Sequence, residues 1–234
     1  MGTKPMKHTG TLFLAWLLLA GCEGSSSPGN TAVTRPPVAS QLVYVVSTAG
    51  LSAYQASDGK QCWSVQSSSP SLLSTQQPLA LGSGVVYWVA DQLYALDASD
   101  GTTRWSAPVG DTPGAVSTRG NLVYVLSADL LYAFNTGDGA LRWRQQLPYN
   151  LGRTATLLLD NGTLYAINGA NLTALCPDSG AIHWQFSLDP DLGESIKEIF
   201  LAGKTLLVWS STTLDGLDAG TGMSSGTKRS RQRI

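Results

Sequence analysis

The sequence is poor in charged side chains. Only 13% of its 234 residues are Asp, Glu, Lys or Arg, about half of the ~25% that is usual for soluble chains. This excludes a chain kept disordered by its own charge and a histone-like binder of nucleic acid. Histidine and cysteine are scarce too, with two and three residues. Hydrolytic and metal sites usually combine several such side chains, so the sequence offers little material for one.

The formal net charge of −1 hides an uneven distribution. Basic residues crowd both ends of the chain, at Lys4 and Lys7 and again over residues 228–233. Residues 22–227 hold nine basic residues against all sixteen acidic ones, which gives this body a net charge of −7. A phosphate backbone is bound through clustered Lys and Arg. We therefore expect no nucleic-acid partner.

Long apolar runs are also missing, with one exception near the N-terminus. Residues 11–20 (TLFLAWLLLA) carry no charge and follow a basic segment. Ten residues fall well short of the ~20 that cross a bilayer as a helix, so a multi-span membrane protein is excluded. A basic start followed by a short apolar core is typical of a secretory signal peptide, which we place at residues 1–21.

Residues 19–22 (LAGC) resemble the lipobox of bacterial lipoprotein signals. In such signals the cysteine thiol is acylated with diacylglycerol, and cleavage leaves the cysteine at the new N-terminus. The resemblance implies lipidation at Cys22 and a membrane-anchored protein of the bacterial cell envelope, on its periplasmic or extracellular face. The alternative is an ordinary cleavable signal in which Cys22 is incidental. Residues 22–37 are rich in Gly, Ser and Pro and predict a disordered tether.

What the sequence has in quantity is an internal repeat with a period near 40 residues. Five boxes with an apolar start, a small third residue and a final Gly begin at Leu51, Leu93, Leu131, Leu172 and Leu214. A Trp stands four residues after that Gly in the first four units, and a strand-like run precedes each box by about ten residues. A further inner strand is expected near residues 77–81, 114–118, 154–159 and 197–202. Such repeats predict the four-stranded blades of an all-β propeller.

The pattern Ala-x-Asp-x-x-x-Gly-x-x-x-Trp, most complete at residues 95–105, resembles the repeat of the pyrroloquinoline-quinone-type (PQQ-like) β-propeller family. In that family the Trp docks between adjacent blades against the Ala and Gly of the motif. The resemblance covers residues 38–222 and implies about five blades. The implied docking residues are Ala53, Gly59 and Trp63; Ala95, Asp97, Gly101 and Trp105; Ala133, Gly139 and Trp143; and Ala174, Gly180 and Trp184. Trp88 and Trp209, in the preceding strands, are expected in the cores of their blades.

The fifth unit departs from the pattern, because Gly226 stands where the repeat would place a Trp. No strand pattern is visible after Gly222, so residues 223–234 predict an irregular basic tail and an incomplete last blade. The units predict either a small closed ring or an open arc, and the open arc is favoured because closure needs a complete set of blades. Our interpretation is a chain truncated or frame-shifted relative to longer relatives, with an exposed edge open to association.

The resemblance also points to a candidate cofactor, because PQQ-like relatives include dehydrogenases that hold the quinone over Ca²⁺. This sequence lacks the vicinal Cys pair that lies near the cofactor in those enzymes. The repeated acidic residues Asp58, Asp100 and Asp138 fit turn capping better than Ca²⁺ binding. His183 is the only His beyond the signal, and its counterparts in the other units share no chemistry with it. We expect no catalytic, cofactor or metal site, and quinone with calcium is the alternative.

The order of signal, tether and repeats is similar to that of the propeller lipoprotein of the outer-membrane barrel-assembly machinery. That resemblance implies a non-catalytic, lipid-anchored scaffold that binds other envelope proteins through propeller loops or an exposed strand edge. The alternative function is that of a PQQ-dependent oxidoreductase-like protein, or of a truncated remnant of a quinoprotein dehydrogenase. A fold of this kind hosts many functions, so the repeats alone do not decide between the two.

Overall fold

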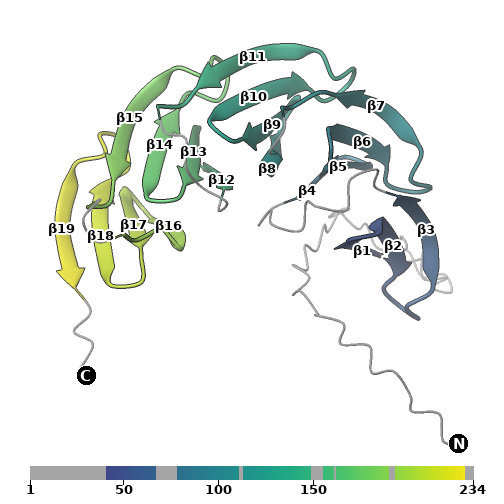
Figure 1. Cartoon of the computed structure of the whole chain (residues 1–234), viewed down its shortest axis with the longest axis horizontal. Helices are drawn as coiled ribbons and strands as arrows, with labels where there is room; N and C mark the ends of the chain where they lie inside the picture. The colour runs from purple at the N-terminus through teal and green to yellow at the C-terminus, as the bar shows by residue number, and fades with distance from the viewer. Residues whose placement is uncertain are drawn as a thin grey trace, which may run out of the picture.

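The computed structural model describes residues 41–66, 78–110, 113–148, 155–160, 162–189 and 193–229. These residues form five antiparallel sheets, here called blades 1 to 5, which follow one another along the chain and lie side by side on an arc (Figure 1). The predicted signal, Cys22 and the tether lie outside the described residues. In the described part, no helix is long and apolar enough to cross a membrane.

Each blade is a meander in which every strand pairs with its neighbour in the chain. Blade 1 has three described strands, β1 (Leu42–Ser47), β2 (Gly50–Gln55) and β3 (Gln61–Gln66). Blade 2 contains β4 (Leu79–Gly82), β5 (Val85–Val89), β6 (Leu93–Asp97) and β7 (Thr103–Ala107). Blade 3 contains β8 (Pro113–Arg119), β9 (Leu122–Ser127), β10 (Leu130–Asn135) and β11 (Leu141–Gln146). Blade 4 contains β12 (Ala155–Asp160), β13 (Thr163–Asn168), β14 (Asn171–Leu175) and β15 (Ile182–Ser187), and blade 5 contains β16 (Glu198–Ala202), β17 (Thr205–Trp209), β18 (Thr213–Asp218) and β19 (Ser224–Arg229).

The strands keep the same place in every blade. The inner strands β4, β8, β12 and β16 lie on the concave side of the arc, and the outer strands β3, β7, β11, β15 and β19 follow its convex rim (Figure 1). Blades 1 and 5 lie at opposite ends of the arc and do not close it. The predicted all-β propeller is therefore confirmed as an open arc, with inner strands at the four expected places.

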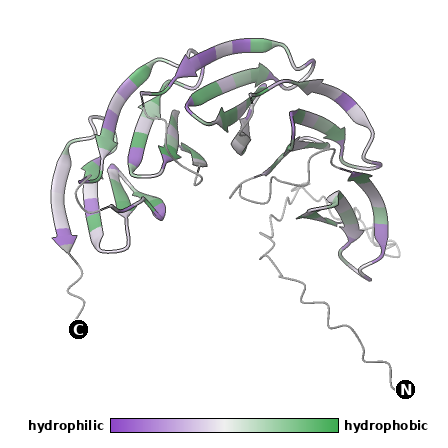
Figure 2. Cartoon of the chain, in the orientation of Figure 1, coloured by the Kyte–Doolittle hydropathy of each residue, from purple (hydrophilic) through white to green (hydrophobic). Residues whose placement is uncertain are grey.

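The core is divided among the interfaces between blades. Four apolar clusters are present, one for each pair of neighbouring blades, and the second strands β5 and β9 are buried along their whole length. Figure 2 shows the apolar residues concentrated on the inner and middle strands, whereas the outer strands are mixed. Burial of one large apolar side chain contributes about 1.5–3 kcal/mol. Each blade therefore depends on its neighbours for stability, as repeats in stacked architectures do.

The Gly that ends each box closes the turn before the outer strand. In blade 2, Gly101 has a φ of +76° and its N–H donates to the carbonyl of Asp97 at 2.9 Å. A side chain at such a φ meets its own backbone, so the turn requires Gly. The carboxylate of Asp100 accepts from the backbone N–H of Thr102 at 2.9 Å. The repeated Asp thus stabilises the turn through local hydrogen bonds.

Blade 5 differs from the prediction in its last strand. Ser224–Arg229 forms β19 and pairs with β18, where the sequence predicted an irregular basic tail. Backbone hydrogen bonds hold an antiparallel pair, and the Gly222 turn, with a φ of +70°, returns the chain alongside β18. The described side chains of β19 are exposed, so the apolar alternation that marks a strand in a sequence is absent. Residues 230–234 lie outside the described part.

Candidate functional site

A row of three side chains crosses each of the first four blades. In blade 3, Tyr124 on β9 lies opposite Ala133 on β10, which in turn lies opposite Trp143 on β11. Residues directly opposite in antiparallel strands share one face of the sheet. The small Ala leaves room above it, and the two aromatic rings meet with centroids 5.9 Å apart. The other rows are Tyr44–Ala53–Trp63, Tyr87–Ala95–Trp105 and Tyr165–Ala174–Trp184.

The Trp of each row extends from its own blade to the next. Trp143 donates from Nε1 to the carbonyl oxygen of Pro177 in blade 4 at 2.9 Å, and its ring covers Gly180. A Cβ at Gly180 would lie 2.6 Å from the indole Cε3. The turn Gly is therefore needed twice, for its positive φ and for the space that the indole occupies. The same contact joins Trp63 to Ala98 and Gly101, Trp105 to Thr136 and Gly139, and Trp184 to Ala219 and Gly222.

The tyrosines of the rows have a packing role. Burial raises the pKa of Tyr124 to about 12, and burial also raises the pKa values of Tyr44, Tyr87 and Tyr165 above the usual 10.0. The phenols are therefore protonated at neutral pH. The hydroxyl of Tyr44 donates to the Ala98 carbonyl at 3.3 Å, so it shares an acceptor with Trp63.

Blade 5 carries a different row. Leu207, Gly216 and Gly226 lie opposite one another where the other blades place Tyr, Ala and Trp. The sheet face that points away from blade 4 exposes 47% of Phe200, 49% of Trp209 and 39% of Leu214. The expectation that Trp209 lies in a blade core is wrong, because no described element covers this face. Trp88, which is covered by blade 1, is 2% exposed and agrees with the expectation.

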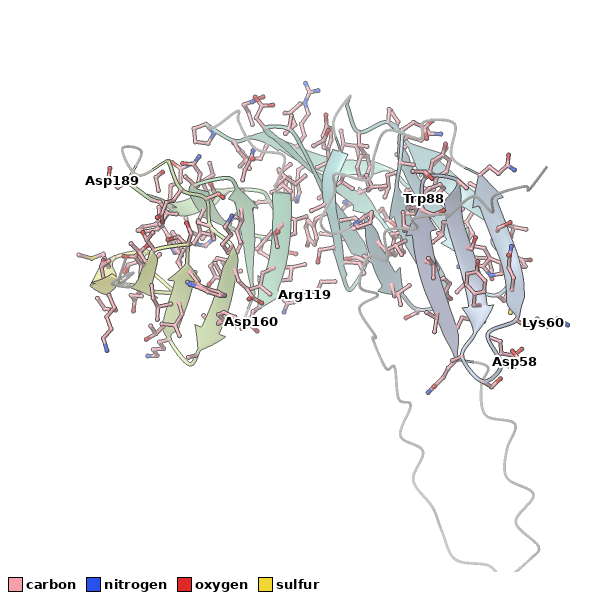
Figure 3. All side chains as sticks on the ribbon, turned by 60° about the horizontal axis from the view of Figure 1, so that its bottom comes forward. Asp58, Lys60, Trp88, Arg119, Asp160 and Asp189 are labelled. Atoms are coloured by element: carbon pink, nitrogen blue, oxygen red, sulfur yellow. The ribbon has the colours of Figure 1, made fainter. Side chains whose placement is uncertain are left out.

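Blade 5 lacks the Trp of the row, whereas blade 1 has a turn Gly that no described Trp covers. Gly59 has a φ of +71°, like the other turn glycines, but no described atom lies within 4 Å of the Cβ position there. The neighbouring residues Asp58 and Lys60 lie at the free end of the blade, at one extremity of the molecule (Figure 3). Blade 1 thus has the turn that receives a Trp in each of the other blades, with no described residue filling it.

The described residues contain no group of three or more His, Cys, Asp or Glu side chains that could hold a metal ion. His183 is exposed on β15. The lowered pKa of Cys176 has a local cause, chiefly a hydrogen bond involving Ser179.

One ion pair accompanies the turn of blade 2. The Arg104 guanidinium contacts the carboxylate of Asp97 at 2.7 Å, and both side chains are partly exposed. Hydrogen bonds from Ser99 and Arg104 hold the pKa of Asp97 well below its usual value. Because the pair lies within one turn and outer strand, it stabilises the local structure.

Residues 48–200 match the family described as outer membrane protein assembly factor BamB. The chain belongs to this family. BamB of Escherichia coli K12 is 37% identical over 83 residues, which cover 32% of this chain and 21% of the relative. The crystal structure of BamB from Moraxella catarrhalis superposes with a TM-score of 0.64 at 15% identity, over 80% of this chain and 60% of that one.

A second kind of structure shares the fold. The quinohemoprotein alcohol dehydrogenase ADHIIG from Pseudomonas putida HK5 superposes with a TM-score of 0.66 at 17% identity, over 82% of this chain and 41% of the dehydrogenase. These likenesses confirm the PQQ-like propeller that the repeats predicted. The chain spans about a fifth of the curated BamB sequence and less than two thirds of the BamB structure. At such identities the structures show a common fold and leave activity to be argued from residues.

The sequence pointed to the repeat residues, but it did not point to the two end faces. The sequence did not predict that Phe200, Trp209 and Leu214 would be exposed on one face of blade 5. An alternating strand pattern does not say which face of the sheet a neighbouring blade covers. Gly226 in place of a Trp was the available signal, since a blade without that Trp has nothing to place on a following turn.

Proposed function

We propose that the chain is a BamB-like scaffold of the bacterial cell envelope that binds other envelope proteins and catalyses no reaction. The observation that carries this proposal is the match of residues 48–200 to the BamB family. The use of the repeated aromatic residues for packing between blades supports it, because these side chains are then unavailable for a substrate. The lack of a metal donor set among the described residues favours the scaffold over the quinoprotein.

The proposal includes a lipid anchor at Cys22, with the tether of residues 22–37 between anchor and arc. Several acyl chains at one terminus give stable membrane attachment, since each buried CH₂ contributes about 0.8 kcal/mol. Partners would then be met at the membrane surface, through propeller loops or the exposed sheet faces at the ends of the arc.

The anchor is tested with the full chain expressed in a bacterial host with an outer membrane. We expect the protein in the membrane fraction, with a mass increment for acyl chains on the peptide that begins at Cys22. The Cys22→Ser variant is expected in the soluble fraction without that increment. Equal membrane recovery of both variants, without the mass increment, would contradict the anchor.

The scaffold role is tested by copurification with the outer-membrane assembly complex of the same host. We expect the complex to be recovered with the wild-type chain, and to be recovered from detergent with Cys22→Ser as well, because protein contacts remain. An absorbance titration with pyrroloquinoline quinone and Ca²⁺ tests the alternative in parallel. Saturable quinone binding combined with no recovery of the complex would replace the scaffold by the quinoprotein-like function.

A further inference from the structure

We propose that β11, the outer strand of blade 3, contacts the surface of a membrane that carries anionic phospholipid headgroups. The contact is made by Arg142 and Arg144, with the apolar side chain of Leu141 beside them. These three residues are named here the blade 3 rim. The inference goes beyond the scaffold role, and it rests on the proposed anchor only in that the anchor brings the arc close to a membrane.

The outer strands of the arc differ in charge from the rest of the body. β3, β7, β11, β15 and β19 contain no Asp or Glu, although residues 22–227 carry a net charge of −7. The acidic residues of the described part lie in turns, loops and the other strands of the blades. The basic residues on the outer strands are Arg104, Arg142, Arg144, Lys228 and Arg229. The convex rim that these strands follow is therefore basic on a predominantly acidic body (Figure 1).

Blade 3 is the one blade whose described residues carry a net positive charge. Residues 113–148 hold three basic residues against two acidic ones, whereas blades 1 and 5 are neutral and blades 2 and 4 are negative. Two of the three, Arg142 and Arg144, are exposed on β11, and the third, Arg119, ends the inner strand β8. Each Lys or Arg near an anionic membrane raises the affinity about fivefold. The charge that favours an anionic surface is thus concentrated on β11.

Arg142 lacks the carboxylate that neutralises its counterpart in blade 2. There the Arg104 guanidinium contacts Asp97 at 2.7 Å. In blade 3 the uncharged Asn135 stands at the place of Asp97, four residues before the turn Gly. Among the described residues, no hydrogen bond or ion pair engages the guanidinium of Arg142 or Arg144. Both groups are therefore available to lipid phosphate, which a guanidinium binds through paired N–H donors.

Apolar side chains lie beside these charges on the crest of the arc. Leu141 is 50% exposed at the start of β11, and Ile182 is 39% exposed at the same place in β15. Figure 2 shows strongly hydrophilic and apolar residues together on β11. Side chains of both kinds on one surface favour the headgroup region of a bilayer. β11 lies at the middle of the arc, where a convex body first touches a flat surface (Figure 1).

The convex shape favours a bilayer over an acidic protein as the occupant. Stable protein partners bury about 800 Å² on each side, and a convex strand of six residues presents little area for a partner to enclose. A bilayer surface needs no complementary shape, and it adapts its headgroups to the cations that approach it. Charge and shape together therefore point to lipid.

The test measures sedimentation of the full chain with lipid vesicles. The chain carries Cys22→Ser, so that acyl chains make no contribution to binding. Vesicles of phosphatidylglycerol and phosphatidylethanolamine supply the anionic surface, and vesicles of phosphatidylcholine supply a surface without net charge. The salt concentration is about 0.1 M, at which charges more than about 10 Å from the surface are screened. Residues 1–21 and the basic C-terminal residues are the same in every variant, so affinities are compared between variants.

We expect Arg142→Gln combined with Arg144→Gln to lower the affinity for anionic vesicles about 20-fold, since each Arg contributes about fivefold. Arg119→Gln is the matched control in the same blade and should change the affinity less than about twofold. Binding to phosphatidylcholine vesicles should be the same for all variants. The three Arg side chains are exposed, so every variant should keep the melting temperature of the wild-type chain.

Two further variants exchange the turn chemistry of blades 2 and 3. Asn135→Asp gives Arg142 the partner that Arg104 has, and it should lower the affinity about fivefold although both rim arginines remain. Asp97→Asn releases Arg104 and should raise the affinity. Opposite changes of this kind do not follow from loss of fold. Hydrogen exchange with and without anionic vesicles locates the contact, and we expect added protection in β11 and none in β3.

Three outcomes would overturn the proposal. One is wild-type affinity for anionic vesicles in the folded Arg142→Gln and Arg144→Gln variant; Asn135→Asp decides in the same way if that variant does not fold. Another is protection by vesicles that leaves out β11. The third is loss of copurified envelope proteins in that variant with unchanged vesicle binding, which would assign the blade 3 rim to a protein partner. Vesicle binding is measured with Cys22→Ser, so its failure is distinct from failure of the acylation and copurification tests.

Discussion

Blades 4 and 5 have the same four strands in the same order, yet only blade 4 carries the Tyr–Ala–Trp row. Both end their third strand at a Gly turn, with φ values of +73° at Gly180 and +70° at Gly222. Both also shift register by one residue between the third and outer strands. The comparison teaches that turns and backbone pairing specify a blade, whereas the aromatic row specifies that another blade follows it.

The two blades also differ in how far their tryptophans are buried. Trp184 in blade 4 is 8% exposed and covers Gly222 of blade 5, whereas Trp209 in blade 5 is 49% exposed. The contribution of an indole to stability depends on the apolar area that it buries. The two blades should therefore respond very differently to loss of an aromatic side chain.

The largest effect is expected for Trp143→Ala, with Trp105→Ala as a second example. Removing a fully buried indole costs about 3–5 kcal/mol. The Trp143 indole is partly buried, so we expect a loss near the lower end of that range, and the variant also leaves the Pro177 carbonyl without its donor. We expect a strongly lowered melting temperature in calorimetry. Trp209→Ala is the control and should lower the melting temperature much less, since half of that side chain is exposed. Equal losses for Trp143→Ala and Trp209→Ala would break the comparison between interior and end blades.

The next largest loss of stability is expected for substitution of a turn Gly, which has two roles: it adopts a positive φ and it leaves space for the indole of the preceding blade. Gly180→Ala combines an unfavourable positive φ with a methyl group 2.6 Å from the Trp143 ring, whereas Gly59→Ala has the positive φ but no described atom within 4 Å of the added methyl group. A positive φ costs an Ala about 1–2 kcal/mol, and overpacking adds about 1–3 kcal/mol. We expect urea unfolding to show the larger loss for Gly180→Ala. If both variants lose the same stability, the indole does not need the space at Gly180.

A smaller loss of stability is expected at high pH, where the buried tyrosines of the rows ionise. Burial raises the pKa of Tyr124 to about 12, so the folded state holds this proton more tightly than the unfolded state, where the value is near 10. The stabilisation is complete below pH 10 and is lost as the pH rises through about 12. Between pH 10 and 12, hydrogen exchange corrected for the intrinsic rate at each pH should show the Tyr-containing blades opening before β17, which has Leu207 instead. Opening free energies that stay the same in all blades from pH 10 to 12 would contradict this assignment.

The smallest effect is expected at the exposed turn of blade 2. Asp97→Asn converts this turn to the form of blade 3, where Asn135 accepts from the backbone N–H of Gly137 at 2.8 Å. Because the pKa of Asp97 is lowered in the folded state, its contribution is present above the unfolded value near pH 4 and is lost as the pH falls through the folded value. The small difference in melting temperature at pH 7 should therefore vanish in acid. A difference that persists in strong acid would assign it to packing.

The sequence predicted the blades because each one repeats the residues that its backbone requires. The positive φ of the five turns appears as a Gly at the same place in each repeat, and buried second strands appear as runs such as residues 85–89. Inner strands were expected near residues 77–81 and 197–202, and the structure has Leu79–Gly82 and Glu198–Ala202. Local chemistry of this kind is readable along the chain.

What the sequence could not predict depends on neighbours in space. β19 is held by backbone hydrogen bonds to β18 and shows no apolar alternation, so its six residues looked irregular. Trp209 sits in a run (TLLVW) like those of the other blades, but its exposure is decided by the lack of a covering blade among the described residues. The turn at Gly59, which no described indole contacts, has the same residue type as the four that an indole covers, and only the fold shows which indole reaches which Gly.

Every strand pair in the described part of the chain joins neighbours in sequence, and this has a consequence for how such a protein changes over evolutionary time. Short loops close with little entropy loss, so each blade can form before distant residues are in place. Duplication or deletion of about 40 residues in frame would add or remove one whole blade without altering the pairing of any other. The indole-on-glycine contact would be inherited with each copy, ready to join the new blade to the old. The arc can therefore change its length in units of one blade while its interior interfaces remain the same.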